Sequence, residues 1–186
     1  MNSMQKAVEG FHKKHDLPVD IGTPKLDEDM LLRIRLISEE SFELVQAIHQ
    51  KNIAEVADAI GDLVFVLYGT AVVYGLDLEV DVEETSSKPM FPDQIIEMSH
   101  VLHLIQKVGD IADSLEGRNL RALQFDLEDT INLCGFISED FGLPIQSIFF
   151  EVVRSNMTKP KLDAHNKGGK GDGFSPVDMV KILYPG

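Results

Sequence analysis

Acidic residues gather in two short runs in the first half of the chain, and their spacing suits metal-dependent chemistry. The runs are Glu39, Glu40 and Glu43, followed by Glu55, Asp58 and Asp62. On helices at about 100° per residue, the first run spans about 100° and the second roughly 60°, so each run makes one acidic stripe. Carboxylates placed face to face repel strongly, and divalent cations that prefer oxygen ligands relieve that repulsion. The two runs therefore predict a metal site.

A solvated helix surface is the competing interpretation of these carboxylates. A helix surface that is stabilised by ion pairs places Lys or Arg three or four positions after each acidic residue. None of the six carboxylates has a basic residue there, and only Arg35 and Lys51 lie four positions before one, in the weaker orientation. Asp58 and Asp62 also flank apolar residues, which places them near the boundary of a core. These features favour a site over a plain surface.

Hydrophobic periodicity predicts the helices that carry these runs. Apolar residues recur at spacings near three and four, and no stretch shows sustained alternation, so the expected fold class is all-α. Gly75 and Gly142 are suited to stop the second helix of each expected pair. Two such hairpins can pack their apolar stripes together as a four-helix bundle. The expected helices cover 31–50, 53–74, 93–115, 119–141 and 145–155.

The two expected hairpins match each other at a constant shift of 67 positions. This shift aligns Asn52 with Asn119 and Asp62 with Asp129, and it also aligns the apolar positions of the two hairpins. Such self-similarity indicates an internal repeat of one helical hairpin, followed by a C-terminal helix and a basic loop. The expected single domain is 1–186, with a first repeat over about 30–84 and a second over about 93–160.

The second repeat has lost most of the acidic motif. The positions that correspond to Glu39, Glu40, Glu43, Glu55 and Asp58 are Gln106, Lys107, Asp110, Ala122 and Phe125. Only the counterparts of Glu43 and Asp62 stay acidic. Conversely, a Gly/Lys-rich loop follows the second hairpin and has no counterpart after the first. Each half keeps much of what the other has lost, so we expect one composite site.

The segment after the second hairpin supplies the positive charge that a triphosphate would need. Lys and Arg neutralise phosphate, an Asn can bond a base or a sugar, and glycines expose backbone N–H groups. Gly171 directly follows Lys170, so the spacing of a P-loop is absent. A flexible solvated tail is the alternative interpretation of this segment. The candidate substrate-binding residues are Arg154, Asn156, Lys159, Lys167 and Lys170.

The bulk composition limits the classes of partner. A net charge of −14 and a pI of about 4.7 exclude a nucleic-acid surface, because a polyanion would be repelled over most of the molecule. No apolar run approaches the roughly 20 residues of a membrane helix, and the charged segment 1–15 is unlike a signal peptide. We therefore expect no membrane partner and a cytoplasmic location. The single cysteine, Cys134, excludes a disulfide framework and suits buried packing.

The acidic runs and their surroundings resemble a known family. Glu39-Glu40-Ser41-Phe42-Glu43 with Glu55-Val56-Ala57-Asp58 resembles the EExxE…ExxD signature of the MazG-type all-α NTP pyrophosphatases. That superfamily includes phosphoribosyl-ATP pyrophosphohydrolase and the dimeric dUTPases. Features similar to the phosphoribosyl-ATP pyrophosphohydrolase branch are Arg35-Leu36-Ile37, Gly61-Asp62-Leu63, Arg154-Ser155-Asn156-Met157-Thr158-Lys159 and Lys170-Gly171.

The resemblance implies a cofactor, a reaction and residue roles. Mg²⁺, with Mn²⁺ as a substitute, would be bound by motif carboxylates, and water would attack the α-phosphorus of a nucleoside triphosphate to release pyrophosphate. Glu39 or Glu40 would act as the general base. The second motif also aligns so that it ends on Asp62, where Ala59 stands at the partner position, and the choice between Glu55 and Asp62 stays open. The candidate metal ligands are Glu40, Glu43, Glu55, Asp58 and Asp62.

The family's dimers also set an expectation for assembly: either a homodimer, or a monomer that acts as a fused pseudo-dimer with one complete site. Three functions remain open from the sequence. The first is an NTP pyrophosphatase, for example a house-cleaning enzyme that acts on dUTP or another deoxynucleotide. The second is hydrolysis of phosphoribosyl-ATP in histidine biosynthesis. The third is a non-catalytic helical protein whose acidic hairpin binds divalent cations or a partner.

Overall fold

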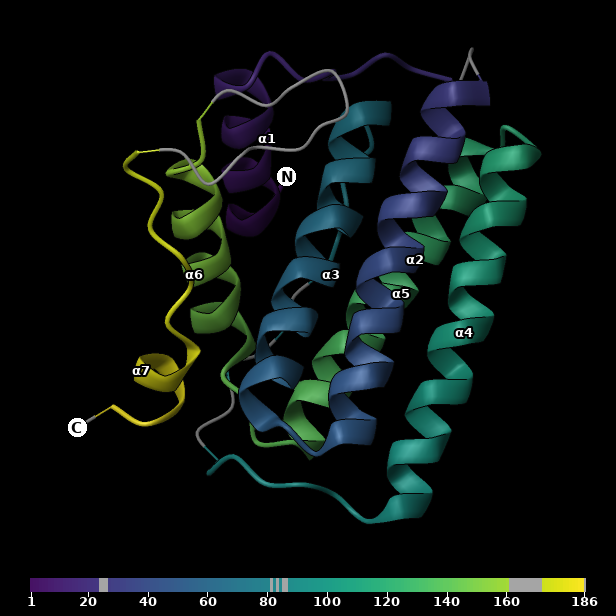
Figure 1. Cartoon of the computed structure of the whole chain (residues 1–186). Coiled ribbons are helices and arrows are strands. Elements are labelled where there is room, and N and C mark those ends of the chain that lie inside the picture. Colours follow the sequence, from purple (N-terminus) through teal and green to yellow (C-terminus); the bar gives the residue numbers. More distant parts are fainter. Residues whose placement is uncertain (24–26, 81, 83, 85–86, 161–171, 186) are drawn as a thin grey trace.

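The computed structural model describes residues 1–23, 27–80, 82, 84, 87–160 and 172–185. Helices are the only regular secondary structure in this part of the chain, so the all-α fold class is confirmed (Figure 1). In chain order the helices are α1 (Ser3–Lys14), α2 (Asp27–Gln50), α3 (Ile53–Tyr74), α4 (Gln94–Glu116), α5 (Leu120–Asp140), α6 (Ile145–Met157) and α7 (Met179–Leu183).

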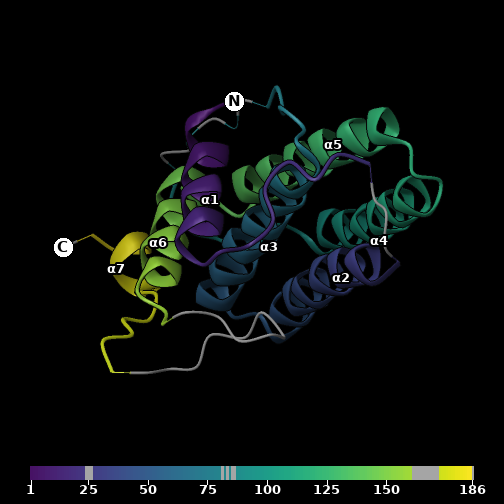
Figure 2. The same cartoon turned by 90° about the horizontal axis from the view of Figure 1, so that it is seen from above.

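The helix pairs α2–α3 and α4–α5 form two hairpins that pack side by side through α2 against α4 and α3 against α5 (Figure 2). Local signals set their ends. The side chains of Asn52 and Asn119 cap α3 and α5 by accepting backbone N–H groups of Glu55 and Ala122. The shift of 67 positions carries the bounds of α2 and α3 onto those of α4 and α5 to within one residue.

Helix α3 is the central element of the molecule, because α1, α2, α5, α6 and α7 all pack against it. Its best 18-residue window has a mean hydropathy of 1.8, which is high enough for a membrane-spanning helix. The expectation that no segment reaches this level was therefore wrong. However, 83% of that window is buried inside the protein, so α3 is the core helix of this bundle.

Helices α1 and α6 form a layer on the side of α3 that faces away from the α4–α5 hairpin (Figure 2). Helix α1 was not predicted from the sequence. It begins after Asn2, which accepts the backbone N–H of Gln5, and it buries Met4, Val8 and Phe11 at helical spacing. The Phe11 ring meets Phe65 of α3 edge to face, with ring centroids 5.1 Å apart. This contact fixes α1 over the face of α3 that also carries the acidic motif.

Cys134 lies in the core between the layers. Its side chain is fully buried, and burial raises the pKa of its thiol to about 12. The prediction that this cysteine is packing material is confirmed.

Candidate active site

A cavity of about 200 Å³ opens between α1, α2, α3 and the end of α6. Four of the candidate site residues line it: Glu40 from α2, Asp62 from α3, and Asn156 and Lys159 from the end of α6. Carboxylates therefore form one wall of this cavity, and an amide and an ammonium group approach from another helix. We refer to it below as the site cavity, and to these four residues as its outer end.

Helix α6 reaches the carboxylates because α3 has a glycine where the two helices cross. A Cβ atom on Gly61 would lie 2.7 Å from Val152 Cγ2 and 2.9 Å from Ile148 Cγ2, which is too close for any side chain. The close approach brings the C-terminal end of α6 beside Asp62, the residue after Gly61. Gly61 is therefore required for the close packing of α3 on α6, and the next residue, Asp62, lines the cavity.

The carboxylates of the two helices are near enough to affect one another's protonation. Burial raises the pKa of Glu40 to about 8, with further increases from Asp62, Glu43, Glu39 and Asp58. A carboxylate with such a pKa holds its proton at neutral pH until a cation or another positive group displaces it.

The two aspartates of α3 behave in the same way. Burial raises the pKa of Asp62 to about 7, and Asp58 increases it further while Lys159 opposes the shift. Burial also raises the pKa of Asp58 to about 6, with contributions from Glu55 and Glu43 in the same direction and from Lys159 in the opposite one. The ammonium group of Lys159 is therefore close enough to these carboxylates to balance part of their charge.

The remaining acidic candidates are more exposed. Glu43 and Glu55 are exposed, although both are close enough to Asp58 to raise its pKa. The Glu39 side chain is 49% exposed and its Oε1 lies 3.6 Å from Arg35 Nη1. Of the two candidate general bases, only Glu40 lines the site cavity.

The donor set fits a hard divalent cation. All the candidate ligands are carboxylates, and Asp58 Oδ1 is buried with no hydrogen-bond partner within the described residues. In the same part of the chain, no three His, Cys, Asp or Glu side chains converge into a ready-made metal site. Binding would therefore require rotamer changes in the exposed carboxylates. Glu40, Glu43, Glu55, Asp58 and Asp62 stay a prediction as ligands.

The structure places Arg154 away from this cavity. Its guanidinium makes two hydrogen bonds of 2.7 Å to the carboxylate of Glu151 and others to Ser175 Oγ and Pro176 O. These contacts tie the segment after 172 to α6, and Arg154 is not among the residues that line the site cavity. Lys167 and Lys170 lie outside the described residues.

Three residues that sequence reasoning did not select line the cavity beyond Glu40 and Asp62: His12, Arg33 and Gly69. The side chains of His12 and Arg33 are 3% and 9% exposed. Arg33 precedes Glu40 by seven residues and therefore lies on the same face of the helix. This spacing could have identified Arg33 from the sequence. No local sequence pattern marks His12, because its place depends on the packing of α1.

The corresponding position in the second hairpin is closed by a lysine. Lys107 Nζ lies 3.0 Å from Asp129 Oδ2 and 3.5 Å from Asp110 Oδ2, which are the counterparts of Asp62 and Glu43. Hydrogen bonding to Asp129 is the main cause of the raised pKa of Lys107. Asp110 and Asp129, the two acidic residues retained in the second repeat, are therefore already paired with a positive group, the ammonium of Lys107.

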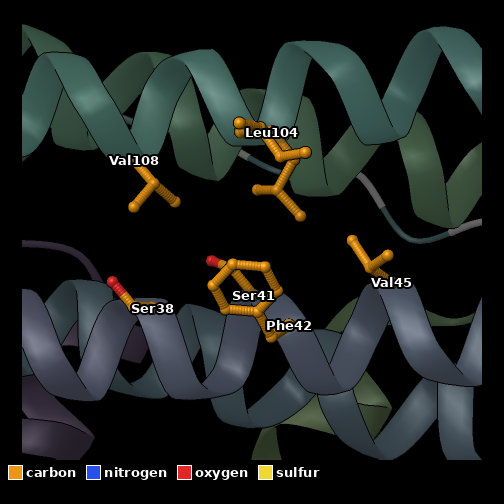
Figure 3. Close-up of a pocket in the computed structure, with 7 residues that line it drawn as sticks. Ser38, Ser41, Phe42, Val45, Leu104 and Val108 are labelled. Atoms are coloured by element: carbon orange, nitrogen blue, oxygen red, sulfur yellow. The ribbon is translucent and has the colours of Figure 1, made fainter.

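A second hollow, of about 50 Å³, lies on the opposite face of α2, where it meets α4 (Figure 3). Phe42, Val45, Leu104 and Val108 point into the space between the two helices, and Ser38 and Ser41 lie on α2 beside them. This hollow has no ionisable group and is too small for a nucleotide. It is a seam between the hairpins, so the site cavity remains the candidate for chemistry.

Part of the chain is similar to known proteins. Residues 9–88 match the family model described as phosphoribosyl-ATP pyrophosphohydrolase, a segment that contains both acidic runs, His12, Arg33 and Gly69. The chain is 30% identical over 144 residues to a protein of uncharacterised function from Acanthamoeba polyphaga mimivirus, an alignment that covers 69% of this chain and 57% of that relative. No solved structure matches. Over residues 9–88, which are less than half of its length, the chain is therefore similar to the phosphoribosyl-ATP pyrophosphohydrolase family.

Proposed function

We propose that this protein hydrolyses a nucleoside triphosphate to the monophosphate and pyrophosphate, using Mg²⁺, which Mn²⁺ can replace. The family supports a pyrophosphohydrolase-like activity in general terms. One observation carries the specific proposal: the site cavity has Glu40 and Asp62 on one side, and Asn156 and Lys159 on the other. Carboxylates that collect cations and an ammonium that attracts phosphate are the two parts that a triphosphate site needs.

Divalent cations at the carboxylates would neutralise the phosphates and make a bound water more acidic. The reaction itself is a substitution at the α-phosphorus. The water oxygen forms a bond to phosphorus, the bridging bond to the β-phosphate breaks, and pyrophosphate leaves with the bonding electrons. Glu40 is the proposed acceptor of the water's proton, because it lines the site cavity and Glu39 does not, and because a cation at the cluster would first displace the proton that Glu40 otherwise holds.

The groups from α6 bind and orient the substrate. Lys159 Nζ supplies positive charge beside Asp58 and Asp62. Asn156 is 6% exposed and presents an amide that can bond the sugar or a phosphate oxygen. Lys167 and Lys170 are proposed to add charge-assisted contacts to the same triphosphate.

The direct test is pyrophosphate release from a panel of ribo- and deoxyribonucleoside triphosphates, dUTP included, with Mg²⁺ and with EDTA. Phosphoribosyl-ATP belongs in the same panel, because the family description favours it as a second candidate substrate. Metal-dependent release from a nucleoside triphosphate supports the proposal. No release from any substrate would leave a non-catalytic cation-binding protein as the better description.

We propose further that one chain holds one complete site, so that a monomer acts as a fused pseudo-dimer. The outer end of the site cavity already combines the first hairpin with the helix that follows the second. Calorimetric titration with a non-hydrolysable triphosphate analogue and Mg²⁺ counts the sites, and sedimentation gives the oligomeric state. One site per chain is expected, and two sites per chain would contradict the proposal. A cytoplasmic location stays a prediction.

A further inference from the structure

The site cavity continues beyond the carboxylates to a second, inner end. Arg33 lies seven residues before Glu40 on α2, and Gly69 lies seven residues after Asp62 on α3. Because the two helices run antiparallel, both steps lead in the same direction, by about 10 Å at 1.5 Å per residue. The cavity is therefore long enough to receive a nucleoside lengthwise, with phosphates at the carboxylates.

The inner end offers one fixed hydrogen-bond acceptor. His12 Nδ1 lies 2.8 Å from the carbonyl oxygen of Pro18, and a carbonyl can only accept, so Nδ1 carries the proton. Burial lowers the pKa of His12 to about 4, which keeps the ring neutral. Nε2 then carries a lone pair, and no described residue donates a hydrogen bond to it. A Cβ atom built on Gly69 would lie 3.3 Å from that nitrogen, so Nε2 faces the space that Gly69 leaves open.

The same end offers a set of donors. The same Cβ atom would lie 3.8 Å from Arg33 Nη1. Burial lowers the pKa of Arg33, and the nearby Tyr74 and Asp29 oppose that shift, but a guanidinium stays charged at any physiological pH. Phe11 and Phe65 supply the apolar walls of this part of the cavity. An apolar lining that ends in a donor and an acceptor suits an aromatic heterocycle.

Resting on the proposed function, we propose that this inner end binds the nucleobase of the substrate by its Watson–Crick edge. Arg33 donates to a ring nitrogen or carbonyl oxygen of the base, and His12 Nε2 accepts from the neighbouring N–H. Phosphoribosyl-ATP carries its second sugar phosphate on N1, on that same edge of adenine. Arg33 and His12 line the inner end of the cavity, so they would meet that second sugar phosphate in place of the base edge. The substrate class is therefore a nucleotide with an unmodified base edge.

The test uses a methyl group to fill the inner end. Gly69→Ala places a Cβ against the ends of the His12 and Arg33 side chains, and it should fold because alanine favours helices. Gly109→Ala on α4 is the matched control, since a Cβ there meets nothing within 4 Å. Equilibrium binding of nucleoside 5′-monophosphates and of ribose 5-phosphate, which has no base, separates the two ends of the cavity.

We expect Gly69→Ala to weaken binding of the monophosphates roughly tenfold or more while binding of ribose 5-phosphate is unchanged. Gly109→Ala should change neither. Arg33→Met should repeat the selective loss for the monophosphates, which provides a second variant that keeps the side-chain volume. Equal losses for both ligands, or no loss, would overturn the assignment of the base to this end.

The substrate panel distinguishes this inference from the proposed function. If Gly69→Ala weakens binding selectively but no triphosphate is hydrolysed, the inner end binds a base and the proposed activity is wrong. If triphosphates are hydrolysed and Gly69→Ala has no effect on their KM, the activity stands and the base lies elsewhere. Faster hydrolysis of phosphoribosyl-ATP than of every common nucleoside triphosphate would overturn the inferred substrate class.

Discussion

The two hairpins share one helical frame and differ most at one aligned position. In the first hairpin, Glu40 stands near Asp62 and Glu43, and burial together with these carboxylates raises its pKa. In the second, Lys107 takes the place of Glu40 and bonds to Asp129 and Asp110. In the second hairpin, the lysine of the chain itself balances the acidic residues. In the first hairpin, no residue at the aligned position does so. The difference indicates that the first hairpin keeps its charge imbalance for a cation that comes from solution.

A second difference between the hairpins lies in the N-terminal turns of α3 and α5. Asp58 has a buried oxygen with no hydrogen-bond partner in the part of the chain that the structure describes, whereas its counterpart Phe125 is 61% exposed. Ala122 stands where the first hairpin has Glu55. Even without Lys107, the second hairpin lacks oxygen ligands at these two positions. The fold alone therefore does not make the site, because the same helices carry both arrangements.

The comparison is most strongly tested by removing one carboxylate from each hairpin. Glu43→Gln or Asp58→Asn should reduce Mg²⁺-dependent pyrophosphate release to below about one hundredth, because each removes a proposed metal ligand. The metal-free fold should stay intact or gain stability, since one source of repulsion is lost. Asp110→Asn, at the position that matches Glu43, is the control and should keep full activity. Full activity in Glu43→Gln and Asp58→Asn would remove the basis for the metal site.

A smaller effect is expected from the groups that the second half contributes. Asn156→Ala and Lys159→Ala should each cost about 1.5 to 3 kcal/mol in kcat/KM, the value of one charge-assisted contact. Mg²⁺ binding, followed by calorimetry, should not change. Arg154→Ala is a useful contrast, because its partners are Glu151 and the segment at 175–176. That variant should lower the melting temperature instead, and unchanged kinetics in Asn156→Ala and Lys159→Ala would argue against a composite site.

A third effect concerns the stability of the metal-free protein. The pKa values of Glu40 and Asp62, at about 8 and 7, exceed the ordinary values of 4.5 and 3.8, so the folded state holds more protons than the unfolded state. Stability should therefore fall as the pH rises from the ordinary values toward the raised ones, and level off above about 8. His12 has a lowered pKa and gives the opposite slope, but only below pH 6.5. Between about pH 7 and 9 we expect the melting temperature to fall by about 2–4 °C.

Two additions check the origin of that slope. Glu40→Gln should flatten it, because the variant has no proton to lose at that position. Millimolar Mg²⁺ should raise the melting temperature, most at the alkaline end, because the folded state alone brings the carboxylates together. A melting temperature that is independent of pH between about 7 and 9, or that does not respond to Mg²⁺, would contradict the assigned charge imbalance.

The helices of the two hairpins were predictable because their signals are local. Periodicity and the caps Asn52 and Asn119 define α3, α4 and α5 to within one residue of the structure. The paired carboxylates follow from the same local geometry. Helix α1 was missed because it is short and carries several charged residues. Its three buried apolar side chains form a recognisable helix face only when α3 is there to pack against them.

The site was less predictable where it depends on burial. His12 and Arg33 are ordinary residues in the sequence, and the packing of α1 and α3 around them turns them into cavity groups. For Arg154, by contrast, the partner that the structure shows can be identified from the sequence alone. Glu151 lies three residues before it on the same helix, a spacing that favours an ion pair, and that local partner takes up its charge.

The smallest effect should come from making the second hairpin more like the first. Lys107→Glu removes a cation from between Asp110 and Asp129 and adds a like charge, so it should lower stability by about 0.5–1 kcal/mol, a modest value because all three side chains are partly exposed. Lys107→Met separates loss of the ion pairs from the added repulsion. Neither variant should create a second site, since Ala122 and Phe125 still provide no oxygen ligands. Calorimetric titration with Mg²⁺ and a non-hydrolysable triphosphate should still give one site per chain. A second site in Lys107→Glu would mean that this lysine alone separates the two hairpins, and that the residues at 122 and 125 are not needed as ligands.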